Sequence, residues 1–481
     1  MTSDMLTTIS QVVTAVTGFV AALLLMYGLK RMSSPATAAS GIRVAGAGML
    51  AAVIASFLYF FSVGADAKPL VFFNLGLAGL AMAIGGSIAW WSGKTVKMTA
   101  MPQMVAIYNG MGGGAAASIA AVELFGNRAD GRTQLIVTLF GALIGAISFS
   151  GSLIAWAKLQ RVLKVPLQFA GQQILNGAVM VAILAVGASI VVAVAGGPQF
   201  LPLPGLICLF FGCALAFGIL MTLPIGGADM PVVISLYNAL TGLAVAFEGF
   251  VLGNAAMIIA GTVVGSAGTL LTQLMARAMN RSLGNVLFSG FGDTGGAAAQ
   301  GTVTGSMKPI DAADVGVMMA FAQKVIIVPG YGMAVAQAQH KVWELSQLLI
   351  DRGVTVRFAI HPVAGRMPGH MNVLLAEAGV PYDLIADLEE VNSEFETADV
   401  ALIIGANDVV NPVARNDKSS PIYGMPILNA DKAKNVIVIK RGQGAGFSGI
   451  ENALFYLDNT RMLYGDGQAA VSQLIAAVKA A

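Results

Sequence analysis

The chain has 481 residues, of which 56% are hydrophobic and 11% charged, and its mean hydropathy is +0.77. A soluble domain usually has about 25% charged residues, so this composition excludes an ordinary soluble protein. The net charge of +2, without a basic block, argues against a nucleic-acid partner. Cys208 and Cys213 lie five residues apart in an apolar segment, where we expect neither a disulfide nor a metal site.

Apolar segments long enough to cross a bilayer occur only in residues 1–281. We count nine, at roughly 5–28, 41–63, 69–91, 102–125, 133–157, 168–195, 202–223, 231–252 and 255–279. The loops after the odd-numbered segments hold ten Lys/Arg, and the other loops hold three. Because cationic loops stay in the cytoplasm, this bias predicts an outside N-terminus and a cytoplasmic C-terminal part.

The apolar part contains an internal repeat. Residues 101–109, MPQMVAIYN, match residues 230–238, MPVVISLYN, and the Gly141-x-x-x-Gly145 spacing recurs as Gly261-x-x-x-Gly265. Small residues at this spacing let helix backbones approach closely. Duplication of this kind is common in transporters, so the repeat suggests a pathway through the membrane.

Four polar residues lie inside the repeated segments. Asn109 and Asn238 each follow a proline by seven residues, about 10 Å into a helix. Each asparagine either forms an interhelical hydrogen bond or lines a path for protons or water. Glu123 and Glu248, near the other ends of the same segments, are either interfacial carboxylates or the outer mouth of that path.

Two charged residues are expected at the cytoplasmic face. Asp229 precedes a helix that starts with proline, so it is expected to be the N-cap residue. Its charge could also couple the membrane part to the soluble part. Arg281 is either an anchor on the cytoplasmic side or a partner for such a carboxylate.

The remaining 200 residues have the pattern of a tethered soluble domain. Residues 282–310 are rich in Gly, Ala, Thr and Ser, which predicts a flexible linker between a membrane domain, 1–281, and a soluble domain, 311–481. In the soluble domain we expect a helix from about Asp311, strands at 324–328, 354–360, 400–404 and 436–440, and a helix from about 335 to 350. This alternation predicts a parallel α/β sheet.

A glycine motif joins the first strand to the following helix. Gly330-x-Gly332-x-x-Val335 is the dinucleotide-binding fingerprint with its third glycine replaced. The second strand ends at His361 rather than at the acid that usually binds the ribose of NAD. Lys440 and Arg441 follow the fourth strand beside further glycines, and this pair suits a 2′-phosphate, although a solvated basic turn would look the same.

Three stretches of the soluble domain are unusually specific for loops: 363–373, 405–412 and 421–428. His361 and His370 bracket a Gly/Pro-rich loop that contains Arg366. The sequence leaves open whether these histidines are structural or functional.

The chain resembles the β subunit of proton-translocating NAD(P) transhydrogenase along nearly its whole length. The residues that carry the resemblance are 226–231, 330–339, 361–375, 405–408 and the Lys440–Arg441 pair. The resemblance implies a membrane bundle that forms a proton channel, and a Rossmann-like domain that binds NADP(H). The residues that it implies at the nucleotide are Gly330, Tyr331, Gly332, Met333, Ala334, Val335, Arg366, Gly405, Asn407, Asp408, Lys440 and Arg441. Asp408, Arg366, Asp229 and Arg281 are candidates for coupling protonation to the nucleotide.

The sequence departs from the family at one important position. Some members have a histidine where Asn109 stands, and the nine segments here contain no histidine. Asparagine does not titrate near neutral pH, so we expect a water chain lined by Asn109 and Asn238, with Glu123 and Glu248 titrating at its ends.

The resemblance also implies a partner, because one fingerprint binds one dinucleotide. NAD(H) is then expected on one or more α subunits, in a dimer of α–β units embedded in lipid in a bacterial-type inner membrane, without a metal. Direct hydride transfer needs no catalytic acid or base. The rival hypotheses are an ion channel or transporter gated by a cytoplasmic nucleotide-sensing domain, and an assembly subunit with a vestigial nucleotide fold.

Overall fold

The computed structural model describes residues 3–32, 34–58, 68–126, 131–163, 167–198, 200–226, 229–280, 282–288, 305–367, 369–418, 420, 422–442 and 450–481. Internal contacts divide the chain into two units, Met1–Pro224 with Ile234–Leu270, and Ile225–Val233 with Leu271–Ala481. The predicted domain limits at 281 and 310 stay a prediction.

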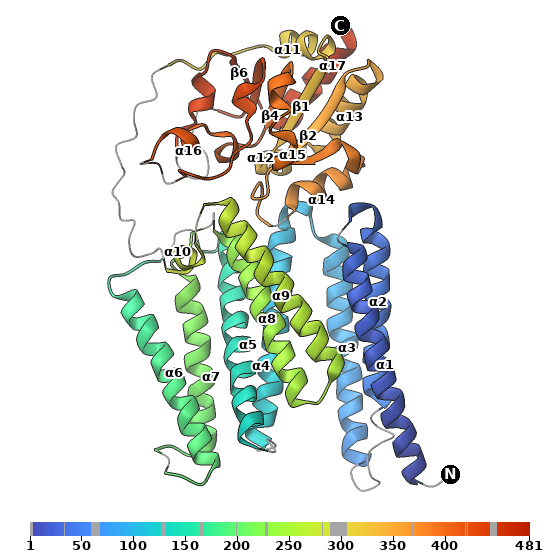
Figure 1. Cartoon of the computed structure of the whole chain (residues 1–481), viewed down its shortest axis with the longest axis vertical. Helices are drawn as coiled ribbons and strands as arrows, with labels where there is room; N and C mark the ends of the chain where they lie inside the picture. The colour runs from blue at the N-terminus through green and yellow to red at the C-terminus, as the bar shows by residue number, and fades with distance from the viewer. Residues whose placement is uncertain are drawn as a thin grey trace. The chain divides into compact units, whose positions relative to one another are not determined.

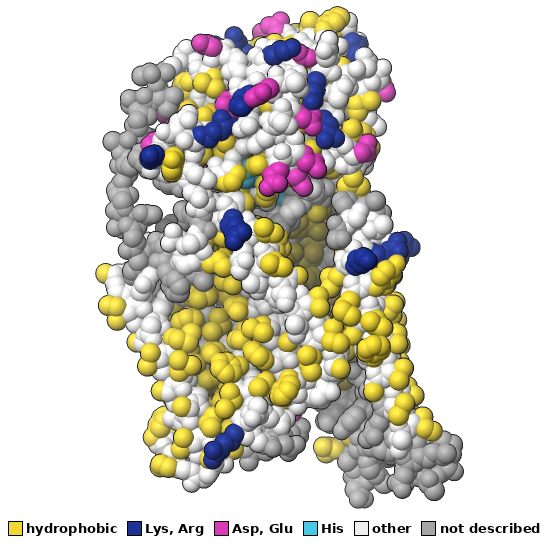
Figure 2. Space-filling model, in the orientation of Figure 1, with side chains coloured by type: hydrophobic (Ala, Val, Ile, Leu, Met, Phe, Trp, Pro, Cys, Tyr) yellow, Lys and Arg dark blue, Asp and Glu magenta, His cyan; other side chains and the backbone are white. Residues whose placement is uncertain are grey.

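The first unit is helical, as predicted (Figure 1). Within the described ranges, nine helices are long and apolar enough to cross a membrane. They are α1 (Ser3–Met32), α2 (Pro35–Leu58), α3 (Lys68–Thr95), α4 (Met101–Gly126), α5 (Arg132–Leu159), α6 (Gln172–Val194), α7 (Leu203–Thr222), α8 (Met230–Val251) and α9 (Ala255–Ala278). The number nine is therefore confirmed, although α2 begins six residues before the predicted segment at 41. Figure 2 shows hydrophobic side chains gathered over these helices.

The sequence repeat corresponds to a repeated mode of helix packing. In the α4–α5 pair, a Cβ on Gly145 would lie 2.8 Å from the carbonyl oxygen of Gly113. In the α8–α9 pair, a Cβ on Gly242 would lie 2.6 Å from the backbone nitrogen of Gly265. Since Gly113 matches Gly242 and Gly145 matches Gly265, equivalent glycines bring equivalent helices together.

We expect Gly145→Ala to destabilise the membrane bundle by about 1–3 kcal/mol, because backbone atoms of α4 would have to move away from the added methyl group. Gly212→Ala in α7 is the matched control, since nothing lies within 4 Å of its added Cβ. Thermal unfolding of the purified protein in detergent measures both. Equal transition temperatures for the two variants would contradict the close packing at Gly145.

The second unit contains a six-stranded, fully parallel sheet with the order β3-β2-β1-β4-β5-β6. The strands are β1 (Lys324–Pro329), β2 (Thr355–Ile360), β3 (Ile385–Asp387), β4 (Val400–Ile404), β5 (Asn435–Lys440) and β6 (Thr460–Tyr464). This is the order of a doubly wound, Rossmann-like fold, which confirms the predicted class. The four expected strands are present, and β3 and β6 are additions.

Both faces of the sheet are covered, which explains the continuous apolar runs in its central strands. Ile326, Val328 and Ile403 face a core that includes Phe395 and Leu454. On the opposite face, the helices α11 (Ala312–Ala320) and α13 (Gln339–Asp351) both pack against α17 (Gly467–Ala480) (Figure 1).

Shorter helices and 3-10 turns connect these elements. They are α10 (Leu283–Phe288), α12 (Tyr331–Val335), α14 (His370–Glu377), α15 (Leu388–Val391), α16 (Val413–Asn416), η3 (Met98–Ala100), η5 (Tyr382–Leu384), η6 (Phe395–Thr397), η7 (Asp408–Val410), η8 (Ala430–Lys432) and η9 (Ala453–Tyr456). The helix expected from about 335 to 350 begins about four residues later, at Gln339. The short helix α12 ends at Val335, and Gln337 between the two helices adopts a positive φ of 51°.

Candidate functional site

The candidate site lies where the strand order reverses, between β1 and β4. Gly330 follows β1 and Gly405 follows β4, and the two loops bond directly. The amide of Gly330 donates to the Ile404 carbonyl at 2.9 Å, and the amide of Gly332 donates to the Gly405 carbonyl at 3.0 Å. In open α/β sheets, ligands bind at this switch point, outside the carboxyl ends of the strands.

Three glycines make the close contact between these loops possible. A Cβ on Gly332 would lie 2.6 Å from the Cα of Gly405, and one on Gly330 would meet the backbone of Gly405 and Ala406. Gly405 has a φ of +70°, and a Cβ there would collide with the backbone of Gly332 and Met333. The sequence thus leaves bare backbone at the switch point, which a pyrophosphate group needs for close approach.

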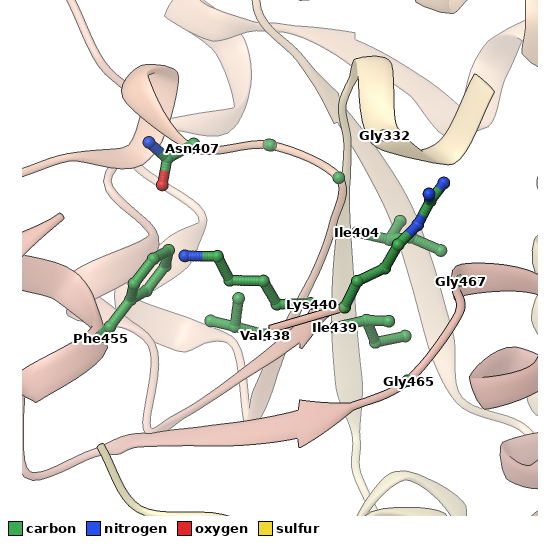
Figure 3. A pocket seen from close by; sticks show the side chains of 12 residues that line it. Gly332, Ile404, Asn407, Val438, Ile439, Lys440, Phe455, Gly465 and Gly467 are labelled. Carbon is green, nitrogen blue, oxygen red and sulfur yellow. The ribbon is translucent and has the colours of Figure 1, made fainter. Parts of the chain in front are cut away.

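A cavity of about 200 Å³ opens beside these glycines (Figure 3). Its lining consists of Gly332, Ile404, Gly405, Ala406, Asn407, Val438, Ile439, Lys440, Arg441, Phe455, Gly465 and Gly467. One wall is therefore the glycine-rich loop region, and the other is the end of β5 with its two cations.

Lys440 and Arg441 differ in how they are held. The Lys440 ammonium lies 4.5 Å from the centre of the Phe455 ring, and in Figure 3 it points toward Asn407. Burial lowers the pKa of Lys440, and the nearby charge of Glu451 opposes that shift. Arg441 is more exposed, with its Nε 3.7 Å from Asp466. Two cations on the wall of a small cavity favour an anionic ligand such as a phosphate.

A second cluster joins the ends of β1 and β2. The Arg366 guanidinium stacks on Tyr331, 4.3 Å from the ring centre, and the His370 ring lies 6.0 Å from that of Tyr331. The Arg366 amide donates to His370 Nδ1 at 3.1 Å. His361 Nδ1 accepts from the Val363 amide at 3.2 Å, so its Nε2 donates to the Pro426 carbonyl at 2.7 Å. These bonds give both histidines a structural role in shaping the loop.

Both histidines are buried and neutral, which makes the domain sensitive to acid. Burial lowers the pKa of His361 to about 4 and that of His370, with help from the Arg366 charge, also to about 4. The unfolded chain binds these protons near pH 6.5, so stability is expected to fall as pH drops from about 6.5 to 4, by at most roughly 3 kcal/mol per histidine. Urea unfolding of residues 282–481 at several pH values measures this. His361→Gln should flatten the pH dependence, and an unchanged slope in that variant would contradict the assignment.

The predicted nucleotide residues separate into three groups. Gly332, Gly405, Asn407, Lys440 and Arg441 line the cavity together. Gly330 and Arg366 lie in the adjoining loops, while Tyr331 begins α12 and Asp408 begins η7. The Asp408 carboxylate accepts a bond from the side-chain amide of Asn407 at 3.0 Å. The side chains of Met333 and Ala334 are buried in the core, and Val335 is exposed at the end of α12.

Sequence reasoning named none of the four site residues that lie after residue 450. Phe455, Gly465 and Gly467 line the cavity, and Asn452 holds the Asn407 carbonyl through a 2.9 Å bond. The sequence signal for these residues is Gly465-Asp-Gly467, but it points to a site only when the strand before it, β6, is recognised. Among the residues that the structure describes, no group of three or more His, Cys, Asp or Glu side chains is arranged to hold a metal ion.

The two membrane asparagines occupy different environments. Asn109 donates to the Ser152 hydroxyl at 3.0 Å and so joins α4 to α5. Asn238 is exposed on the surface of this chain. The structure thus does not place the two repeat mates in one shared lining, and the water chain lined by both stays a prediction.

The four charged candidates of the membrane part also differ. Glu248 is fully buried and Glu123 is half-buried. Asp229 is buried just before α8, and its carbonyl accepts from the Val233 amide at 3.1 Å, as an N-cap residue does. Arg281 lies outside the described residues.

The fold and site together define a multi-pass membrane protein with a Rossmann-like domain. More specifically, the chain belongs to the NAD(P) transhydrogenase beta subunit family, whose model matches residues 14–477. It is 46% identical, over 470 residues, to NAD(P) transhydrogenase subunit beta of Rhodospirillum rubrum. The matched region covers 95% of this chain and 97% of that relative. The relative from strain ATCC 11170 matches to the same extent. The chain is therefore an enzyme component of a family that uses NAD(H) and NADP(H), and the family's name, beta subunit, implies an alpha-subunit partner.

Proposed function

We propose that this chain binds NADP(H) at the switch-point cavity and exchanges hydride with NAD(H) held by the alpha subunit, coupled to proton movement across the membrane. The membrane is a bacterial-type inner membrane, with the Rossmann-like domain in the cytoplasm and the N-terminus outside. Two alpha–beta units form the working dimer.

One observation carries the choice of NADP(H) over NAD(H). Lys440 and Arg441 stand on the cavity wall beside Gly332 and Gly405, where the dianionic 2′-phosphate would gain two cationic partners. The end of β2 carries His361, with its ring engaged by the backbone, and not an acid that would repel such a phosphate.

The cavity fits one end of the dinucleotide. Its volume of about 200 Å³ is below the ~300–1,000 Å³ typical of a complete ligand site, and it suits the phosphate-bearing ribose. The pyrophosphate would lie against the bare backbone of Gly330 to Gly332, and the stacked Tyr331–Arg366 pair would border its other end. When bound, NADP(H) supplies the nicotinamide that gives or takes the hydride. The chain's own contribution is to position it and exclude water, since direct transfer needs no acid or base.

Proton coupling supplies the drive, because the two nucleotides differ little in hydride-donating power. At a proton-motive force of roughly 200 mV, one proton delivers about 4.6 kcal/mol. At about 1.4 kcal/mol per factor of ten, that shifts the NADPH/NADP ratio by about three powers of ten. Asp229, Arg281, Arg366 and Asp408 are the proposed coupling residues, and Asn109, Asn238, Glu123 and Glu248 the proposed proton route.

The test uses membrane vesicles that contain this chain and its alpha partner. We expect NADH to reduce an NADP analogue at a rate that an imposed proton gradient raises and an uncoupler lowers. A nucleotide-dependent ion flux without hydride exchange would support the gated channel or transporter instead. Titration of the 282–481 fragment with NADPH addresses the vestigial-fold rival, which requires that NADPH does not bind.

A further inference from the structure

Glu248 is a buried acid without a partner. It lies three residues before the end of α8, and its side chain is 0% exposed. Neither carboxylate oxygen has a hydrogen-bond partner in the part of the chain that the structure describes. An unpaired charge in such a place is far more costly than a neutral acid, so the protonated carboxyl group is the stable form.

The bundle is shaped to receive this carboxyl group. It lies against Gly141 of α5, in the space that a Cβ on Gly141 would fill. The repeat mate of Gly141 is Gly261, and the space around Gly261 is filled by backbone atoms of Gly242 and Ala246 instead. The repeat mate of Glu248 is Ile119, at the same offset of 129 residues that relates Asn109 to Asn238. The acid is thus a departure from the repeat, and the opposing glycine leaves room for it.

A second carboxyl group connects this position to the surface. Glu123, near the corresponding end of α4, is half-buried and interacts electrostatically with Glu248. No other ionisable group among the described residues does so. At this end, α5 begins with the exposed Arg132 and presents Gly141 and the side-chain amide of Gln134, which donates to the Val251 carbonyl at 3.1 Å. The nearer half of α9 contains no ionisable residue. Two interacting carboxylates repel each other when both are charged.

Polar side chains follow Glu248 along the contact between α8 and α5, which we call the seam. Thr241 lies seven residues earlier on α8, about 10 Å along the helix axis. Its hydroxyl is 2.6 Å from that of Ser148 on α5, and Asn109 bonds Ser152 one turn farther along α5. Asn238, three residues before Thr241 on α8, is exposed.

We infer that Glu248 is a proton-binding site of the membrane bundle, exchanging its proton with Glu123 on one side and with the Thr241–Ser148 seam on the other. The inference rests on the proposed proton coupling and names the group that binds the proton in a bundle whose nine segments contain no histidine.

The first experiment labels the purified alpha–beta complex with dicyclohexylcarbodiimide, which reacts with protonated carboxyl groups in apolar surroundings. The acid adds across the carbodiimide without a leaving group, so peptide mass spectrometry finds the whole reagent mass on Glu248. We expect labelling to fall as pH rises and to be reduced at least tenfold in Gly141→Ala, whose methyl group displaces the carboxyl group. Gly212→Ala, with open space around its Cβ, should label like the wild type. An unlabelled Glu248 in the wild type would overturn the inference.

The second experiment measures protons moved per hydride in reconstituted vesicles. Glu248→Gln should reduce proton movement at least tenfold while NADPH affinity stays within twofold, and Glu248→Asp should restore part of it. Wild-type coupling in Glu248→Gln would refute the site and leave the proposed function intact. Absence of hydride exchange in the wild type would instead refute the proposed function, and the labelling would still decide the state of Glu248. If Glu248→Gln does not assemble, Gly141→Ala and the wild-type labelling decide.

Discussion

Replacing Lys440 or Arg441 by alanine is expected to weaken NADPH binding by about 10- to 100-fold and to leave NADH binding to the same site nearly unchanged. A hydrogen bond to a charged group contributes about 1.5–3 kcal/mol, and 1.4 kcal/mol corresponds to a factor of ten. NADH lacks the 2′-phosphate, so it has no group for these cations to recognise. Fluorescence titration of the 282–481 fragment with both nucleotides measures the difference.

The two substitutions should not be equivalent. Lys440 also packs on Phe455, so its loss removes a cation–π contact as well as a charge. Arg441 is exposed beside Asp466, so its loss should act mainly through the phosphate. Lys434→Ala is the control, because Lys434 pairs with Asp399 at 2.8 Å and does not line the cavity. Equal losses of affinity for NADPH and NADH would show that the pair supports the fold and does not recognise the 2′-phosphate.

The central strands could be predicted from the sequence, and the edge strands could not. β1 and β4 are apolar runs because they have a neighbour on each side and a covered face above and below. β3 and β6 are the two edges of the sheet. β3 has three residues, and β6 ends in the exposed Tyr464. Neither has the long apolar run that marks a buried strand, so the sequence predicts neither strand. The loop with Gly465 and Gly467 follows β6, so the sequence does not place this loop at the site either.

The repeat predicted which helices correspond, but not which residues share an environment. The glycines that pack α4 on α5 and α8 on α9 could be matched because close backbone approach needs the same residue in both pairs. Asn109 and Asn238 also match, yet one bonds Ser152 and the other is exposed. The difference arises because the face that each helix presents depends on its further neighbours. α8 also packs on α5, where the Ser148 hydroxyl donates to the Tyr237 carbonyl at 3.0 Å.

The Lys440–Arg441 pair could be predicted because its position depends only on the strand before it. The position of Phe455 could not be predicted. This residue reaches the cavity from the 3-10 turn η9, and an aromatic residue in such a turn usually packs into the hydrophobic core. Its effect on Lys440 is a tertiary one. The ring holds the ammonium group above a largely apolar wall formed by Val438 and Ile439. Without that cation, a phosphate at this wall would lose its bound water and gain no charge partner in return.

Gly405→Ala should have the largest effect of any single substitution at the site. The residue has a φ of +70°, which costs a non-glycine residue about 1–2 kcal/mol, and its Cβ would collide with the backbone of Gly332 and Met333. Overpacking adds about 1–3 kcal/mol, so we expect a loss of about 2–5 kcal/mol in stability and at least a 100-fold loss in NADPH affinity. The affinity falls because the two loops must separate, and the backbone that faces the pyrophosphate moves with them.

Gly353→Ala separates the two causes, because Gly353 has a φ of +84° with nothing within 4 Å of its Cβ. It lies in the turn before β2, away from the cavity, so this control should cost only the backbone term, about 1–2 kcal/mol, and should leave NADPH affinity unchanged. Urea unfolding and NADPH titration of both variants, in the 282–481 fragment, measure the difference. If Gly405→Ala matched Gly353→Ala in both measurements, neither stability nor NADPH binding would depend on the close approach of the two loops. That result would contradict the proposal that the pyrophosphate binds at the switch point.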